Sequence, residues 1–339
     1  MGSSRVRMSR LIGPLVVAWE MTPIACTEDA VDSRGPVVAE QVSGESGHIG
    51  RIHVVLQPRP DELEPEPELQ ISGRFIEYRG LSETLVRARA NLPVPAWEQL
   101  VIGQCVASEA LLPVPGPLPP YDHARELSMI DAGDLRVGLG NSGEWREFVA
   151  PLSLVPDILP WLSGVEYGHV DDRIPQLAVD PDGTSPVSVS VDGSPDGTLE
   201  GFSINVAVPA GVTVDAARVT EDRLTIDWHP PGHFSPFAVL RLQALTPGED
   251  GVNEPAGEEV TCLVADSGRA DLSLAPLSDA GLAAHADLLR VSVSRFDVTK
   301  VRAGNFGVVD VFVELRAQRL LHSAPHDVEE PEIGVAPTQ

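Results

Sequence analysis

Prolines and glycines interrupt this sequence so often that they exclude long helices and favour short strands joined by turns. The chain contains 31 prolines and 30 glycines among 339 residues, about 18% in all, where ~12% is usual. An interior proline removes a hydrogen bond from a helix and clashes with the preceding turn. Hydrophobic residues make up 42% of the chain, close to the ~45–50% typical of globular proteins. We therefore expect a folded, mainly β protein.

Runs of alternating apolar residues lie between these turns, most regularly in the second half of the chain. Strands are expected at 49–56, 69–78, 101–106, 135–139, 187–191, 203–208, 223–228, 238–245, 259–265, 270–274, 288–298 and 306–316. Turn dipeptides such as Asp192-Gly193 and Ser267-Gly268 separate them, a spacing typical of a sandwich or barrel. Short helices are expected at 82–91, which ends before Pro93, and at 277–285.

The composition divides the chain into five segments. We expect an export signal at 1–25, a flexible tether at 26–48, an N-terminal β-rich domain at 49–170, a C-terminal β-sandwich domain at 171–322 and a disordered acidic tail at 323–339. The predicted fold is two β-sandwich-like domains, the second immunoglobulin-like, with a few short helices.

The charge balance limits the partners. The chain has 24 basic against 50 acidic residues, a formal charge of −26. Such a field repels phosphate backbones and anionic lipid headgroups. Nucleic acid is therefore excluded as a partner, and we expect contact with a membrane only through a lipid at the N-terminus.

The N-terminus has the plan of a secretory signal. Arg5, Arg7 and Arg10 precede a short apolar run at 11–19, which is far below the ~20 residues needed to span a bilayer. Ala25-Cys26 resembles the cleavage site of bacterial lipoproteins, in which the cysteine becomes the lipid-modified first residue of the mature chain. We favour lipidation of Cys26 and a place at the outer membrane or cell surface of a Gram-negative bacterium. Cleavage without lipid, which gives a secreted protein, and an uncleaved tail are the alternatives.

Three cysteines in an exported chain leave one without a partner, and lipidation of Cys26 accounts for it. Cys105 and Cys262 then remain. They either form a disulfide that clamps two domains together or are buried in strands as small unpaired hydrophobic residues. The chain contains no CxxC pair, so thiol exchange and zinc-ribbon chemistry have no support.

Calcium is the one metal for which the sequence offers candidate ligands. They are the carboxylates of four turn residues, Asp180, Asp182, Asp192 and Asp196. Calcium prefers such hard oxygen ligands, but no EF-hand loop is completed and Asp-Gly is also a common turn dipeptide. We favour the turn interpretation and expect no other cofactor. His229 and His233 are four apart, but the prolines and glycine between them exclude a metal-binding helix and predict a loop.

Known catalytic motifs are absent from the sequence. The stretches 44–47 and 140–143 are near-misses to G-x-S-x-G and lie outside a strand-to-helix elbow. Acidic residues are numerous enough to supply a carboxylate pair, so an exported carbohydrate- or peptide-acting hydrolase is the alternative to a binding protein. Among the tryptophans, Trp228 is expected in the core because Leu224 and Ile226 share its face. Trp145 is the candidate for ligand contact, although packing is favoured there too.

Four stretches resemble uncharacterised predicted surface lipoproteins of the myxobacterial type. They are 130–135 (IDAGDL), 158–168 (ILPWLSGVEYG), 224–230 (LTIDWHP) and 260–268 (VTCLVADSG). The resemblance extends over about residues 49–322. It implies a cell-surface β protein without known activity, so it assigns no functional residues. Two residues depart from the usual lipoprotein signal. Pro23 stands where an aliphatic residue is usual, and Glu20 puts a charge beside the apolar run. Both departures concern attachment of the lipid rather than export.

These observations together predict a non-enzymatic exported protein of the cell envelope. We expect a lipid-anchored binding or scaffolding module that presents acidic surface loops to an unknown protein or glycan partner. A purely structural envelope component is a third interpretation, and it would have neither a cleft nor an exposed aromatic residue.

Overall fold

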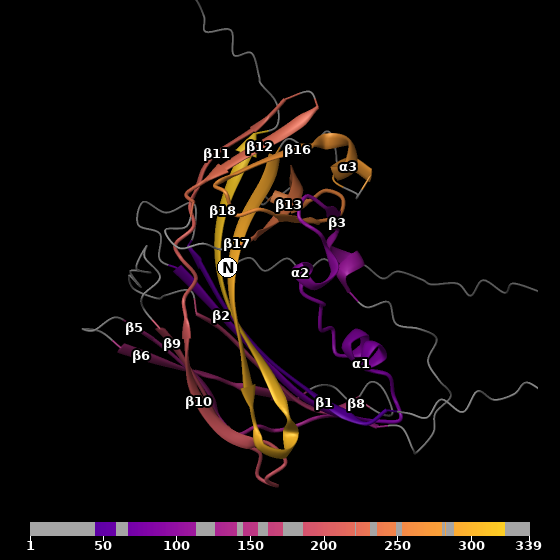
Figure 1. Ribbon diagram of the computed structural model, residues 1–339, viewed down its shortest axis with the longest axis vertical. Coiled ribbons are helices and arrows are strands. Elements are labelled where there is room, and N and C mark those ends of the chain that lie inside the picture. Colours follow the sequence, from indigo (N-terminus) through magenta and orange to yellow (C-terminus); the bar gives the residue numbers. More distant parts are fainter. Residues whose placement is uncertain are drawn as a thin grey trace, which may run out of the picture. The chain divides into compact units, whose positions relative to one another are not determined.

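The computed structural model describes residues 45–58, 67–112, 126–140, 145–154, 162–171, 186–220, 222–230, 236–248, 253–279, 282 and 288–322. In these residues the chain is mainly β, with three sheets and a few short helices (Figure 1), which confirms the predicted class. None of the described helices is long and apolar enough to cross a membrane.

The largest sheet, here called the long sheet, has eleven strands. From one edge to the other they are β3 (Cys105–Ala107), β15 (Val260–Val264), β13 (Ala238–Pro247), β17 (Leu288–Arg302), β18 (Val308–His322), β1 (Gly47–Pro58), β2 (Pro67–Arg79), β4 (Glu126–Met129), β8 (Leu162–Asp171) and β7 (Leu152–Leu154), and β14 (Asn253–Pro255) pairs with β13. The expected antiparallel pair of β1 and β2 is confirmed. β1 also pairs in parallel with β18, which joins the two ends of the described chain in one sheet.

Two smaller sheets complete the β structure. The four-stranded sheet has the order β10 (Glu200–Ala207), β9 (Pro186–Gly193), β5 (Leu135–Gly140) and β6 (Trp145–Ala150). The three-stranded sheet has the order β11 (Val214–Val219), β12 (Arg223–Trp228) and β16 (Arg269–Ser273). Most of these strands match the predicted ranges. Neither β6 nor β11 was predicted; in β11, Asp215, Ala216 and Ala217 break the alternation of apolar side chains.

One apolar core lies between the long sheet and both smaller sheets. Ile52 and Val54 of β1, Leu240 of β13, Val137 of β5 and Ile226 of β12 are buried in the same cluster. Side chains alternate between the two faces of a strand, so one face of the long sheet supplies this core. The other face, which carries residues such as Arg51 and His53, is covered by the helices α1 (Glu83–Arg89) and α2 (Ala96–Gln99) (Figure 1).

The described strands do not follow the predicted division into domains at residues 170 and 171. β1 and β2 continue the sheet formed by β17 and β18, and β9 pairs with β5. The described residues therefore form one compact unit rather than two. Local alternation predicts a strand but does not identify its partner, which explains why the boundary differs. The predicted export signal, most of the tether and the acidic tail lie outside the described residues.

The short helices are α1 (Glu83–Arg89), α2 (Ala96–Gln99), α3 (Leu274–Asp279) and the 3₁₀ turns η1 (Ser108–Leu111) and η2 (Gly304–Phe306). α1 confirms the helix expected at 82–91, with Ser82 as its N-cap. The chain leaves α1 through Ala90 and Asn91, and the positive φ of Asn91, 48°, lets Leu92 N–H reach Arg87 O at 2.9 Å, the bond of a Schellman cap.

Two predicted ranges differ from the structure. Instead of a strand over 101–106, only Cys105–Ala107 is extended and the preceding residues form a turn, because α2 and the turn bring the chain to the sheet edge. α3 begins three residues before the helix expected at 277–285, and most of the rest of that range lies outside the described residues.

Candidate ligand-binding site

A segment that we call the strap, residues 92–111, lies across the face of the long sheet that is turned away from the main core (Figure 1). It runs from the end of α1 through α2 to β3 and η1. Arg51 on β1 fixes the first part of the strap to the long sheet, because its Nη1 donates to the carbonyl of Pro93 at 2.6 Å. Val94 N–H donates to Leu111 O at 3.2 Å, which joins the two ends of the strap.

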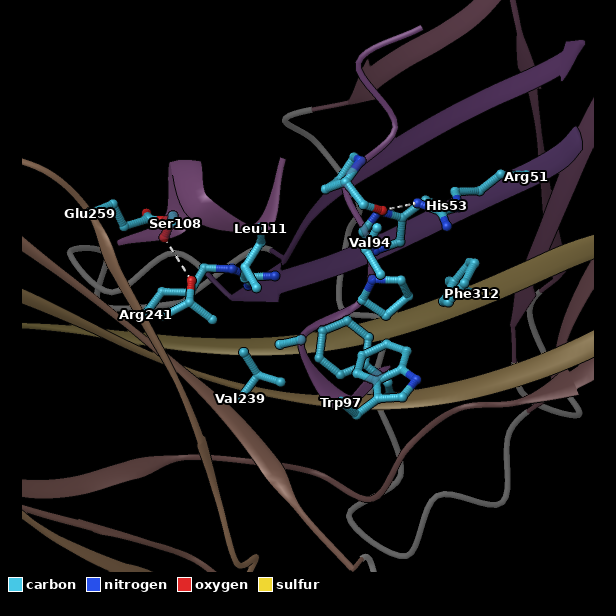
Figure 2. A pocket seen from close by; sticks show the side chains of 15 residues that line it. Arg51, His53, Val94, Trp97, Ser108, Leu111, Val239, Arg241, Glu259 and Phe312 are labelled. Atoms are coloured by element: carbon cyan, nitrogen blue, oxygen red, sulfur yellow. Dashed lines mark hydrogen bonds between the residues drawn. The ribbon is translucent and has the colours of Figure 1, made fainter. Parts of the chain in front are cut away.

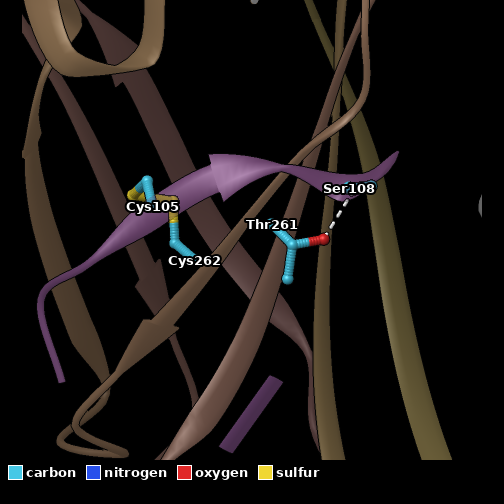
Figure 3. Close-up of a disulfide and its surroundings, with 4 residues drawn as sticks. All are labelled: Cys105, Ser108, Thr261 and Cys262. Carbon is cyan, nitrogen blue, oxygen red and sulfur yellow. Dashed lines mark hydrogen bonds between the residues drawn. A yellow bond between two sulfur atoms is a disulfide. The ribbon is translucent and has the colours of Figure 1, made fainter. Parts of the chain in front are cut away.

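A disulfide fixes the far part of the strap. Cys105 on β3 and Cys262 on β15 lie directly opposite each other in an antiparallel pair and are bonded, with an S–S distance of 2.03 Å (Figure 3). The sequence had left this pairing open. The bond joins positions 157 residues apart, and it secures the strap to the edge of the long sheet rather than one domain to another.

A cavity of about 250 Å³ lies between the strap and the long sheet (Figure 2). Its lining residues are Arg51, His53, Pro93, Val94, Pro95, Ala96, Trp97, Ser108, Leu111, Val239, Arg241, Glu259, Thr261, Phe296 and Phe312. Figure 2 shows Arg51 and His53 toward one end and Arg241, Ser108 and Glu259 toward the other. The cavity therefore combines an apolar wall with polar groups at both ends.

Trp97 of α2 forms the centre of the apolar wall. Its ring stacks on Phe237 with centroids 5.5 Å apart and lies tilted at 4.7 Å from Phe296 and at 6.0 Å from Phe312. Aromatic rings at such distances attract each other beyond their area burial. The ring is thereby held in one position, as a binding surface requires.

The floor beside the cavity holds a buried carboxylate with several cations, here called the Glu314 cluster. Glu314 of β18 has no exposed side-chain surface. Its Oε1 accepts from Arg241 Nη1 at 2.7 Å, from Ser294 Oγ at 2.7 Å and from Arg316 Nε at 2.9 Å, and its Oε2 lies 2.9 Å from His53 Nε2. Both carboxylate oxygens are therefore hydrogen-bonded, Oε1 to three side chains and Oε2 to one.

The electrostatics of this cluster keep Glu314 ionised. Burial alone would raise the pKa of its carboxyl, but Arg241, Arg316 and His53 outweigh burial and hold that pKa well below its usual range. Burial alone would lower the pKa of the Arg241 guanidinium, but the negative charge of Glu314 has the larger effect, so that pKa is raised. A carboxyl held in this way does not donate a proton near neutral pH.

The other polar groups of the cavity form a short row at its far end. Ser108 Oγ lies 3.0 Å from Glu259 Oε1 and 2.6 Å from Thr261 Oγ1 (Figures 2 and 3). Ser108 belongs to the strap and the other two to the β15 side of the sheet, so this row also helps to close the cavity.

A second hollow of about 430 Å³ lies on the same face, beyond His53. Its lining residues are His53, Val55, Gln70, Ile71, Ser72, Gly168, His169, Val170 and Arg316. The hollow is larger than the first cavity, but its lining in the described part of the chain includes no tryptophan, no phenylalanine and no residue of the strap. The cavity under the strap is therefore the better ligand site.

A second buried ion pair, the Arg295 cluster, lies on the core face of the long sheet. Arg295 of β17 and Asp266 are almost completely buried, and Asp266 also accepts from Trp228 Nε1 at 2.8 Å. Arg295 donates through Nε and Nη2 to Asp266, through Nη2 to His229 O, and through Nη1 to the carbonyls of Ala210 and Gly211. These bonds use all five of its N–H groups, so the cluster joins three loops and has no donor left.

The predicted calcium ligands do not form a site in the described residues. Asp192 is paired with Arg136, at 2.7 Å from Oδ1 and 3.0 Å from Oδ2. Asp196 accepts from Ser194 Oγ and from the backbone and hydroxyl of Thr198. The carboxylate of Asp192 thus pairs across two strands, β9 and β5, whereas that of Asp196 closes a turn. Asp180 and Asp182 lie outside the described residues, as do Cys26 and His233. No group of three or more metal-ligating side chains occurs in the part of the chain that the structure describes.

Trp145 lies away from both hollows. It is 52% exposed on β6, and its ring lies so close to Gly138 of the neighbouring strand that a Cβ there would come within 2.2 Å of it. The ring is therefore partly packed and partly exposed, and its role as a ligand contact stays a prediction. Trp228 is buried as predicted.

Sequence reasoning missed the residues around the cavity. Arg51 and His53 alternate with buried residues and look like the solvent face of a strand. The sequence did contain a signal for the Glu314 cluster. Arg241 and Glu314 are each the single charged residue of an apolar run, at 238–242 and 311–315. A lone charge in such a run indicates a buried, paired side chain.

Comparisons with known proteins place the chain in no family. No protein-family model matches it, and no curated protein matches it. Among solved structures, it is similar to the crystal structure of chicken CNTN1 FN1-FN3 domains, at 12% identity over 79% of this chain and 69% of that chain, with a TM-score of 0.15. At that TM-score the likeness supports no conclusion about this chain.

Proposed function

We propose that the protein is an exported, non-enzymatic binding protein of the cell envelope that holds a small ligand between the strap and the long sheet. The observation that supports this is the cavity with a rigid aromatic wall and polar ends. Pockets of this kind, mostly apolar with a few placed polar groups, are typical ligand sites.

The state of the carboxylates favours binding over hydrolysis. A glycosidase needs one carboxyl with a raised pKa as its acid, whereas the pKa of Glu314 is lowered by its cations. Glu259 lines the cavity and accepts from Ser108. The alternative, a carbohydrate- or peptide-acting hydrolase, would have to use Glu259 with a partner from elsewhere.

Export and anchoring belong to the same proposal. The Cys105–Cys262 disulfide supports a place outside the cytoplasm, where such bonds persist. We propose lipid attachment at Cys26 to the outer membrane or cell surface of a Gram-negative bacterium. Cell fractionation of the Cys26→Ser variant tests the anchor: the variant should move to the soluble fraction, and an unchanged distribution would contradict it.

We also propose an immunoglobulin-like sandwich, for strands β11 to β18 rather than for all of 171–322. Its support is the strand order, since β15-β13-β17-β18 on one side and β11-β12-β16 on the other give four strands facing three. This is the layout of many cell-surface binding domains. The acidic surface loops remain candidates for a second, protein or glycan partner.

Native mass spectrometry of the full chain, purified from its own envelope, tests the binding function. We expect a bound small molecule in the wild type, loss of that molecule in Trp97→Ala and its retention in Trp145→Ala, the matched control. Retention in both variants would place the ligand elsewhere. If the bound molecule is instead converted to products, and Glu259→Gln stops the conversion, the hydrolase alternative is correct.

A further inference from the structure

The lining of the cavity also indicates what kind of ligand it takes. We propose that the ligand is a small organic acid, a single anionic group on a flat apolar body. This proposal rests on the binding function proposed above and specifies the ligand class for the same cavity.

The first argument is the charge of the lining. The whole chain has a net charge of −26, yet the cavity is lined by two guanidinium groups, those of Arg51 and Arg241, and by one carboxylate, Glu259, while Glu314 lies buried behind Arg241. The chain's field alone would favour a cation. Cationic side chains gathered at a hollow in so acidic a chain therefore indicate an anion.

The second argument is that both arginines have N–H groups without a hydrogen-bond partner among the described residues. In the described part of the chain, the hydrogen bonds of Arg241 leave from Nη1 alone, toward Ser294 and Glu314. Arg51 uses Nη1 for the strap, and its Nη2 has no hydrogen-bond partner among the described residues. A ligand carboxylate would supply acceptors for such donors, and guanidinium groups match it geometrically.

The third argument concerns the body of the ligand. Trp97, Phe296 and Phe312 offer ring surfaces, and Pro93 and Pro95 have no N–H to donate. Arg51 lies over Phe312 at 4.9 Å from the ring centroid, so the charged and flat surfaces adjoin. The volume of about 250 Å³ is below the ~300–1,000 Å³ of pockets for drug-sized molecules, which limits the body to about one ring.

A cationic ligand fits the lining less well. Glu259 is the carboxylate on the lining, and its Oε1 is already bonded to Ser108. Glu314 has both oxygens occupied and is buried beneath its cations. An ammonium group in the cavity would therefore find Glu259 Oε2 as its one unbonded carboxylate oxygen among the described lining residues, and it would face two guanidinium groups.

Three probes that share one body test the charge requirement: phenylacetate, the neutral phenylacetamide and the 2-phenylethylammonium ion. Their affinities for the full chain are measured by isothermal titration at low salt. We expect phenylacetate to bind at least tenfold more tightly than phenylacetamide, and the ammonium ion to bind most weakly. An ammonium ion that binds as tightly as phenylacetate would overturn the proposal.

Two arginine variants locate the effect. Arg51→Gln should weaken phenylacetate about tenfold more than phenylacetamide, because loss of the bond to Pro93 O affects both probes alike, whereas Arg79→Gln, which removes an exposed arginine outside the cavity, should change neither. Equal weakening of both probes by Arg51→Gln would mean that the arginine only supports the strap, and would contradict the proposal.

The outcomes separate the ligand class from the binding function. If all three probes bind equally and Trp97→Ala removes binding, the cavity is a ligand site and the organic-acid class is wrong. If no probe binds and the natively purified protein also has no small molecule bound in the cavity, the binding function itself fails.

Discussion

Two buried charge clusters lie on opposite faces of the long sheet and differ in what remains once their own bonds are made. In the Arg295 cluster, guanidinium and carboxylate are sealed from solvent, at 1% and 0% exposure, and every N–H has an acceptor. In the Glu314 cluster only the carboxylate is sealed, while Arg241 is 23% and Arg316 22% exposed.

This difference separates a structural role from a binding role. A saturated cluster can only hold its loops together, because it has no donor to offer. A cluster whose carboxylate is saturated but whose cations reach a cavity keeps donors in position for a ligand. The number of unused donors, rather than burial, therefore marks the candidate site.

The largest effect is expected from breaking the Arg295 cluster. Asp266→Ala leaves Arg295 buried without a counter-charge and removes the acceptor of Trp228, so the free energy of unfolding should fall by about 3–5 kcal/mol. Urea denaturation measures it. Asp271→Ala, which removes an exposed partner of Arg223, is the control and should have little effect. A similar loss in both variants would refute the structural role.

Removal of the disulfide should loosen the face of the long sheet that carries the cavity and leave the Arg295 cluster on the other face unchanged. The double variant Cys105→Ala, Cys262→Ala releases the strap from β15, and the free energy of unfolding should fall by about 2–4 kcal/mol. Binding of phenylacetate should weaken as well, because the strap forms the roof of the cavity. Unaltered binding in the double variant would show that the strap needs no covalent anchor.

Glu314→Gln should lower stability less than removal of the disulfide does, and it should strengthen the binding of phenylacetate rather than weaken it. Its cations are partly exposed and can be hydrated, so we expect a loss of about 1–3 kcal/mol in urea denaturation. Phenylacetate should bind more tightly, because a competing negative charge is gone. Asp266→Asn is the matched control for binding and should leave the affinity of the folded protein unchanged. Weaker phenylacetate binding in Glu314→Gln would contradict the account.

The pH dependence of stability gives a further test of Glu314. The pKa of its carboxyl is lower in the folded protein than its ordinary value of 4.5. Its contribution is therefore present above that value and is lost as the pH falls toward the folded pKa. Below about pH 4.5 the wild type should lose stability more steeply than Glu314→Gln. Parallel curves would contradict the ion cluster.

The smallest effect is expected at Asp196, outside both clusters. Hydrogen bonds from Ser194, then from Thr198, lower the pKa of this exposed carboxyl from 3.8 to about 2. Its contribution is present above pH 3.8 and is lost as the pH falls toward about 2. Asp196→Asn should thus flatten the acid side of the thermal-stability profile slightly and leave calcium binding, measured by titration, unchanged from the wild type.

The sequence predicted the parts of this molecule that depend on local pattern. The alternation of Leu224, Ile226 and Trp228 predicted β12 and its buried face, and the stretch 82–91, which ends before Pro93, predicted α1. β11 lacks such alternation and was missed. The pairing of β1 with β18 joins residues about 260 apart, and no local pattern reports such a contact.

The candidate site could not be predicted from the sequence for the same reason. Its lining comes from β1, the strap, β13, β15, β17 and β18, which meet only in the folded sheet. Arg51 looks like an ordinary surface residue until the strap is seen to cover it. By contrast, the single charge of Glu314 within an apolar strand was visible in the sequence, although its partners were not.

A crystal structure of the full chain with phenylacetate tests the central claim most directly. The account predicts the ring of the probe against Trp97 and its carboxylate within hydrogen-bond distance of Arg51 or Arg241, with the Arg295 cluster unchanged. A probe bound away from the strap, or a carboxylate turned away from both arginines, would contradict it.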